Sequence, residues 1–399
     1  GENGPLLIEN VSVDGFEVGI RTSIQTASQT FEDISLTNQK VFGWVNEADQ
    51  NVFVRNLTSV NEVRAIHNAP FRVGQNAVFT LIDSTLQGTG DAANEIAILT
   101  EERFYARNVT TDGYARPVSY RQANGFIAGN RDLQGDYIEE YWSEGGQNRR
   151  TGGTHELFSG TADTTLRLPI SDAPEADLET DLTKWASPSS FVSANPDGTP
   201  SGIPGDAFDD SRAIQSAIDS GATTIYFPND GRWVIDDVVT VRGNVERING
   251  LESRLASLTG DGRVRLGNTS ADSVTIERFA GTGATQVTYE HVSDQTIVAR
   301  NMQGFQYQPI TDAPGDLYLY DVVQSHFEFR NQNVWARQLN VEGRANSQDA
   351  TLPDQKILND NSNVWVLGLK LENEGTVVRT INGGSTELTV ISIDAQQFR

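Results

Sequence analysis

Two glutamates, Glu342 and Glu372, occupy the same place in two neighbouring repeats of the sequence. Each follows the turn residue of its repeat, Gln338 or Gly368, by four positions. If neighbouring repeats stack as adjacent parallel strands, equivalent residues lie about 4.8 Å apart. Two carboxyl groups this close repel each other, which raises the pKa of one and leaves an acid beside a base. The pair therefore predicts a catalytic dyad for hydrolysis of a glycosidic bond, which needs two flanking carboxyl groups.

A solvated acidic surface explains the same pair without any chemistry. The chain carries 54 Asp and Glu against 30 Lys and Arg, so two outward carboxylates align by chance easily. If the dyad is real, Glu342 is the choice for the acid because it stands beside the largest insertion of its region, residues 343–354.

Aromatic residues near the dyad are candidates for contact with a sugar, because aromatic faces pack on the apolar faces of sugar rings. Each lies one residue away from a position predicted to face the core, so each should point outward. Packing of one stack of repeats against another is the alternative partner. The candidate substrate-binding residues are Trp335, Trp365, Tyr318, Tyr320 and Arg337.

Other polar residues are weaker candidates for a functional role. Arg300, Arg330 and Arg337 are available as the base of a lyase or as carboxylate clamps. Asp321 occupies a turn position, which favours a structural role. His67 and His291 lack metal-ligand spacing, so a packing or surface role is favoured for both.

These residues sit in a repeat that begins near Leu6. An apolar strand meets a polar turn, and a second apolar strand follows. A period of 20 to 30 residues with Asn or Asp at one fixed point indicates a solenoid. Asn and Asp tolerate the left-handed backbone of a sharp corner. In the first half of the chain the turn residues are Asn10, Asp33, Asn56, Asp83 and Asn108, at spacings of 23, 23, 27 and 25.

Period-2 alternation then places one set of side chains in a common core. The repeat resumes in the second half, so the sequence predicts an all-β fold of two tandem right-handed parallel β-helices. The predicted inward residues are Ile8, Val11, Val13, Val54, Leu57, Ala106 and Val109. The turn residues of the second half are Arg278, Asn301, Asp321, Gln338, Gly368 and Ser392.

The segment from Asp206 to Trp233 predicts a lid over the open end of the second stack. Asp209 and Asp210 should begin a helix at about residues 209–220, with Ala213, Ile214, Ala217 and Ile218 on its apolar face. We expect a first β-helix domain at 1–160, shortened at its N-terminus, an interdomain linker at 161–205 that lies along a protein surface, and a second β-helix domain at 206–399. The aromatic stretch 113–159 either caps the first stack or forms a sugar-binding wall.

The lid segment, with DAFDDSRAIQSAIDSG followed by IYFPNDGRW, resembles the opening of pectate-lyase-superfamily β-helix domains. Two such helices joined by a long linker are similar to the family 55 glycoside hydrolases, which are exo-β-1,3-glucanases. The resemblance implies an extracellular or cell-surface protein that hydrolyses a β-glucan, with inversion through a single Glu acid and a positioned water. The predicted Glu342 and Glu372 separation instead favours retention. The superfamily also includes lyases, epimerases and tailspikes.

Bulk properties exclude other classes. A net charge of −24 argues against nucleic acid as a partner, and no apolar run is long enough for a membrane span. An acidic chain is also a poor host for a polyuronate unless calcium bridges the two, which favours hydrolysis of a neutral glucan over a lyase reaction. We expect a polysaccharide partner and no cofactor, with calcium left open. The alternative is a structural, adhesive or filament-forming protein that associates with itself.

Overall fold

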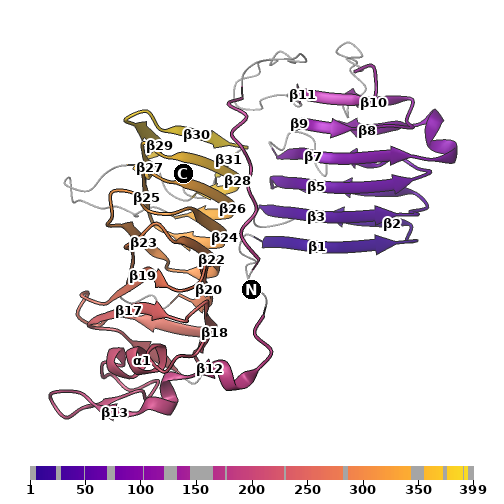
Figure 1. Ribbon diagram of the computed structural model, residues 1–399. Coiled ribbons are helices and arrows are strands. Elements are labelled where there is room, and N and C mark those ends of the chain that lie inside the picture. Colours follow the sequence, from indigo (N-terminus) through magenta and orange to yellow (C-terminus); the bar gives the residue numbers. More distant parts are fainter. Residues whose placement is uncertain are drawn as a thin grey trace, which may run out of the picture. The chain divides into compact units, whose positions relative to one another are not determined.

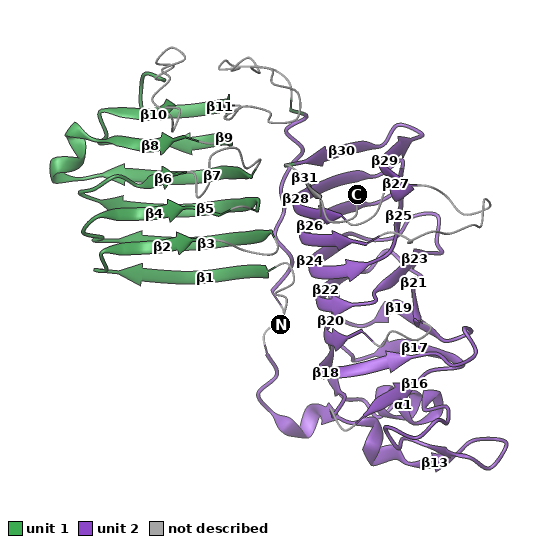
Figure 2. Cartoon of the chain, turned by 180° about the vertical axis from the view of Figure 1, so that it is seen from behind, with its two compact units in different colours: residues 1–165, 389–392 green, residues 166–388, 393–399 purple. Residues whose placement is uncertain are grey.

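The computed structural model describes residues 6–23, 28–48, 50–69, 77–101, 103–120, 133–143, 165–175, 178–228, 231–281, 286–342, 355–371, 375–389 and 391–393. The chain divides into two compact units, residues 1–165 with 389–392, and residues 166–388 with 393–399 (Figure 2). Each unit contains ladders of parallel strands stacked lap upon lap (Figure 1). The fold is therefore a parallel β-solenoid of the all-β class, as the repeat predicts.

Unit 1 is built from two sheets. Both are parallel except at one end, where β11 pairs antiparallel with β9. One sheet, in spatial order, contains β1 (Leu6–Asp14), β3 (Gln29–Thr37), β5 (Val52–Asn61), β7 (Val78–Gly88), β9 (Arg103–Thr110) and β11 (Tyr137–Ser143). The other contains β10 (Arg116–Tyr120), β8 (Ile96–Thr100), β6 (Ile66–Asn68), β4 (Phe42–Asn46) and β2 (Val18–Thr22). A 3-10 helix at Gly90–Asn94 precedes β8.

The main sheet of unit 2 also follows the laps of the solenoid. It runs through β12 (Trp185–Ala186), β15 (Thr224–Tyr226), β18 (Arg247–Ala256), β20 (Ser273–Ala280), β22 (Thr296–Gln303), β24 (Leu317–Gln324), β26 (Asn333–Val341), β28 (Asn363–Leu371) and β30 (Ser385–Leu388), with β16 (Arg232–Val234) beside β18. The short strand β31 (Ile391–Ile393) follows near the end of the chain.

Smaller sheets close the laps of unit 2. One contains β17 (Val238–Gly243), β19 (Arg263–Thr269), β21 (Thr288–His291) and β23 (Gln306–Pro309), and another contains β25 (Phe327–Arg330), β27 (Gln355–Asp360) and β29 (Thr376–Ile381). A hairpin joins β13 (Ser193–Ala194) to β14 (Pro200–Ser201), and 3-10 turns lie at Leu182–Lys184 and Pro188–Phe191. None of the helices in the described ranges is long and apolar enough to cross a bilayer.

The predicted corner residues adopt the left-handed backbone that makes the turn. In unit 1 all five have φ between 50° and 58°. Glu9 pairs with Glu32 and Val11 with Ile34, so Asn10 lies beside Asp33 on the next lap. In unit 2 the predicted corners from Arg278 to Gly368 also have positive φ, from 49° to 77°. The prediction of a corner at Ser392 was wrong, because this residue lies inside strand β31 and does not have a positive φ.

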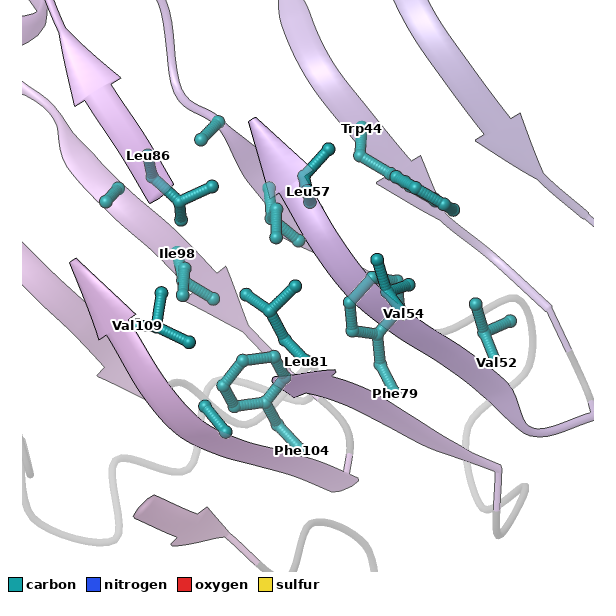
Figure 3. Close-up of a cluster of buried hydrophobic side chains, with 14 of the residues drawn as sticks. Trp44, Val52, Val54, Leu57, Phe79, Leu81, Leu86, Ile98, Phe104 and Val109 are labelled. Carbon is teal, nitrogen blue, oxygen red and sulfur yellow. The ribbon is translucent and has the colours of Figure 1, made fainter. Parts of the chain in front are cut away.

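The side chains predicted to face inward form the core of unit 1. Val54, Leu57, Ala106 and Val109 are fully buried, and the predicted residues of β1 pack against the same cluster while half-buried. Figure 3 shows the side chains of Val54, Leu57 and Val109 in one cluster with the rings of Phe79 and Phe104 from neighbouring laps. Alternation along each strand therefore builds one layer of core per lap.

Part of the stretch 113–159 caps unit 1. Tyr141 of β11 is buried in the core cluster, and the Tyr137 hydroxyl donates to Asn108 Oδ1 at 3.0 Å. Because β11 runs antiparallel to β9, the parallel stacking ends there. Arg149, Arg150 and His155, also considered for a sugar-binding wall, lie outside the described residues.

The lid of unit 2 contains helix α1 (Ser211–Ile218), which buries Ala213, Ile214, Ala217 and Ile218 as predicted. The helix start differs in one respect. Asp210 does not cap the helix with its side chain; it accepts hydrogen bonds from Gly202 N at 2.8 Å and Val234 N at 2.9 Å. Asp210 therefore ties the lid to the preceding loop and to β16, and its burial raises the pKa of the carboxyl to about 6.

His291 is a packing residue in unit 2, as expected. It is fully buried; its Nδ1 lies 2.9 Å from the Tyr307 hydroxyl and its Nε2 lies 2.8 Å from the Gln295 carbonyl oxygen. Burial lowers the pKa of His291 to about 4, against the opposing effects of the Gln295 carbonyl and the Asp294 charge. The imidazole is therefore neutral in the fold at pH 7.

This burial predicts an acid-dependent loss of stability. The unfolded chain takes up a proton at His291 below about pH 6.5, whereas the fold does so only below about pH 4, so the stability due to neutral His291 is lost as pH falls between these values. The loss is on the order of 3 kcal/mol. Urea unfolding of the wild type and of His291→Gln at pH 7.5 and 4 checks this, because the difference between the two proteins should shrink by that amount. An equal difference at both pH values would contradict it.

Candidate functional site

The predicted sugar-contacting residues lie on the outer face of β24, β26 and β28. Residues Leu317, Leu319 and Ala336 on these strands are fully buried in the core, and the residues between them point to the other face. Tyr318 pairs with Trp335, and Trp335 with Trp365, in one column across the laps. The rings of Tyr318 and Trp335 stack at 4.9 Å between centroids. The sequence therefore predicted the orientation of this column correctly.

The exposure of these rings is low despite their outward orientation. Tyr318 is 4% exposed, Trp335 9% and Trp365 1%. Residues 168–173 of the same unit cover Tyr318 and Trp335, and we call this segment the linker strap. Trp335 Nε1 donates to the Pro169 carbonyl oxygen at 2.8 Å, and Ser171 Oγ lies 3.0 Å from the Tyr318 hydroxyl.

Arg337 anchors the linker strap from the next column. Its guanidinium, fully buried, donates to Asp172 Oδ1 at 2.6 Å and to the Ser171 carbonyl oxygen at 2.9 Å. It also lies 5.1 Å from the ring centroids of Tyr320 and Trp365. These contacts combine a charge-assisted hydrogen bond with cation–π attraction.

The linker strap crosses the laps in order. Leu168 N donates to Glu387 on β30, and Ala173 N donates to the Tyr320 hydroxyl on β24. This part of the predicted linker therefore lies along the strands of unit 2. The sequence analysis proposed a sugar or a second stack of repeats as the partner of the aromatic column. The structure instead places the chain's own linker strap against Tyr318 and Trp335. A sugar can reach the faces under the strap only if residues 168–173 move away.

Glu342 directly follows the last residue of β26, and its side chain is exposed. Its backbone N donates to the Gln324 carbonyl oxygen at 3.0 Å, and Asn340 Nδ2 lies 3.4 Å from Glu342 Oε1. The pairing of β26 with β28 continues through Val341 and Leu371. Glu372 lies outside the described residues, as does the insertion 343–354.

Asp321 occupies the corner of β24 with φ of 53°, which confirms its predicted place in the turn column. Burial raises the pKa of its carboxyl to about 6. Nothing in the sequence distinguishes Asp321 from Asp33 and Asp83, which occupy equivalent corners of unit 1.

The remaining candidates have structural partners. Arg330 forms an ion pair with Glu328 and lies 3.6 Å from Asp360. The Arg300 guanidinium lies 4.1 Å from the Tyr320 ring centroid, and His326 Nδ1 lies 2.9 Å from the Gln355 carbonyl oxygen. Within the described ranges, no group of three or more His, Cys, Asp or Glu is arranged to hold a metal ion.

Comparison with known proteins adds no assignment to this geometry. No family model matches the sequence, and no curated protein is significantly similar to it.

Proposed function

We propose that this parallel β-solenoid protein binds a neutral β-glucan and hydrolyses its glycosidic bonds with Glu342 and Glu372 as the acid and base. The observation that supports the proposal is the strand register. Asn340 pairs with Lys370 and Val341 with Leu371 directly before the two glutamates. Residues paired in adjacent parallel strands lie about 4.8 Å apart. This spacing favours a pair of cooperating carboxyl groups.

The proposed reaction needs one proton donor and one acceptor. The acid protonates the glycosidic oxygen as the bond from that oxygen to the anomeric carbon breaks, and the electron pair stays on the leaving oxygen. In an inverting reaction the second carboxylate removes a proton from the water that attacks the anomeric carbon. In a retaining reaction it attacks that carbon itself and water then releases the sugar. We take Glu342 as the acid because it stands beside the insertion at residues 343–354.

Assays with laminarin and polygalacturonate test this function. We expect reducing ends from laminarin and no unsaturated product absorbing in the ultraviolet from polygalacturonate. Proton NMR of the first product then reads its anomeric configuration: retention supports a close glutamate pair, whereas inversion supports the family 55 resemblance. Absence of reducing ends from laminarin would refute the proposal.

A structural role is the second candidate, favoured by the edge of unit 1. Strand β1 ends its sheet, and among the described residues no strand pairs with its outer side. Leu6 and Phe16 near this edge are 45% and 64% exposed. An unpaired edge with exposed apolar side chains is a site for pairing with another chain. Light scattering that shows growing assemblies, together with no activity on either polysaccharide, would favour this role.

A further inference from the structure

The linker strap buries little of itself on unit 2. Residues 168–173 form neither helix nor strand, and Ala173 is the only one of the six that is buried. Pro169 and Asp172 are exposed although both contact the sheet. A segment with little buried apolar surface opens locally at a low cost in free energy. The strap can therefore leave the sheet while the solenoid beneath it stays folded.

The face beneath the strap points polar groups at it. Trp335 donates through Nε1 and Arg337 through its guanidinium. Tyr318 and Tyr320 present their hydroxyl groups. Aromatic rings with polar tips, beside a cation that donates several hydrogen bonds, can bind the apolar faces and the hydroxyl groups of a sugar. The chemistry of this face therefore suits a hydroxylated ligand.

The strap meets most of these groups with oxygen atoms. The Pro169 and Ser171 carbonyl oxygens accept hydrogen bonds at 2.8 and 2.9 Å, and the Ser171 hydroxyl lies 3.0 Å from that of Tyr318. The strap crosses from β30 to β24, over laps about 4.8 Å apart. Sugar hydroxyls also accept and donate hydrogen bonds. An oligosaccharide lying along the same line can therefore replace these contacts.

The ion pair between Arg337 and Asp172 is the strongest of the ties described. The Arg337 side chain is 0% exposed and that of Asp172 is 64% exposed. Hydrogen bonds between charged groups are roughly twice as strong as neutral ones. When the strap leaves, Asp172 regains its hydration and the guanidinium faces the ligand that takes its place. Removing the Asp172 carboxylate therefore favours the open state without changing the covered face.

We propose that the linker strap is an autoinhibitory segment. It occupies a glucan-binding face formed by Tyr318, Tyr320, Trp335 and Arg337, and a glucan binds there only when the strap leaves. The inference rests on the proposed function for the class of its ligand, and it adds the regulation of binding. The apparent affinity is the affinity of the open face multiplied by the fraction of molecules that are open. Weakening the strap therefore tightens binding.

Calorimetric titration with laminaripentaose tests the strap. Asp172→Ala should bind about tenfold more tightly than the wild type, because it loses a strong hydrogen bond that holds the closed state. Asp219→Ala is the matched control, since Asp219 pairs with the surface residue Arg242 of the same unit. It should bind like the wild type. Adding Tyr318→Phe to Asp172→Ala should weaken binding again, because the open face then lacks one hydroxyl.

Hydrogen exchange of the strap amides gives a readout that does not depend on activity. The Leu168 amide donates to Glu387 and the Ala173 amide donates to the Tyr320 hydroxyl. Peptides that contain residues 168–173 should exchange faster in Asp172→Ala. They should also exchange faster in the wild type at saturating laminaripentaose, because a ligand that binds only the open state raises its population. A purely structural strap would not respond to the sugar.

The outcomes separate this inference from the proposed hydrolysis. Unchanged or weaker binding by Asp172→Ala, strap exchange that does not respond to sugar, or no binding by either protein would overturn the inference. Tighter binding by Asp172→Ala without reducing ends from laminarin would support the strap and refute hydrolysis. Reducing ends with equal affinity in both proteins would do the reverse. If Asp172→Ala melts well below the wild type, Ser171→Ala replaces it, with a smaller gain in affinity expected from loss of the Tyr318 contact.

Discussion

Replacing Glu342 with glutamine is expected to lower the rate of laminarin hydrolysis by about 10²- to 10⁴-fold, the usual contribution of a general acid or base. Glutamine keeps the size of the side chain and cannot donate a proton to the glycosidic oxygen. Because Glu342 is exposed at the end of β26, the substitution should leave the melting temperature nearly unchanged. Initial rates of reducing-end release over a range of laminarin concentrations measure the effect.

The control for this prediction is Glu246→Gln, a substitution of an exposed glutamate elsewhere in unit 2. It should hydrolyse laminarin like the wild type. If Glu342→Gln keeps full activity, Glu342 belongs to the solvated acidic surface that the composition already explains. If Glu372→Gln alone removes activity, the assignment of the acid has to pass to Glu372.

Replacing Arg337 with alanine is expected to destabilise unit 2 by about 3 kcal/mol. The change removes a fully buried side chain, two hydrogen bonds to the linker strap and the contacts with Tyr320 and Trp365. Hydrogen bonds of a charged group contribute about 1.5–3 kcal/mol each, and Asp172 can return to water after the loss, which limits the cost. Urea unfolding followed by tryptophan fluorescence measures the change.

The matched control is Arg242→Ala. Arg242 also holds a carboxylate, with two hydrogen bonds of 2.7 Å to Asp219, but it lies at the surface. Exposed ion pairs contribute only about 0.2–1 kcal/mol. Trypsin gives a second readout, since loosening of the linker strap in Arg337→Ala should speed cleavage after Arg167. Equal stability losses in the two variants, or unchanged cleavage, would show that the strap does not depend on Arg337.

The corner residues show how much of the fold is readable from the sequence. Asn10, Asp33 and Asn56 were assigned to corners from residue type and spacing, and all three have positive φ and lie in one column. The reason is local: few residue types other than glycine adopt the left-handed conformation at low cost. Alternation is local too, because successive side chains of a strand point to opposite faces.

The candidate site shows where this reasoning ends. Trp335 was correctly predicted to point outward and Arg337 was a candidate for substrate contact, but their partners Pro169 and Asp172 are 166 and 165 residues away in the chain. No pattern in either segment indicates the contact. Asp210 was predicted to cap α1 and instead holds the loop at Gly202 and strand β16 at Val234.

The sequence by itself determined the solenoid, its corners, its core positions and its helical lid, since each follows from the conformational preference and polarity of residues close together in the chain. Only the tertiary structure decided that the linker strap covers the aromatic column and that Asp321 is desolvated while Asp33 accepts a hydrogen bond from Asn56. Burial and hydrogen bonding depend on which distant segments meet, and that information is not carried by residue type or spacing.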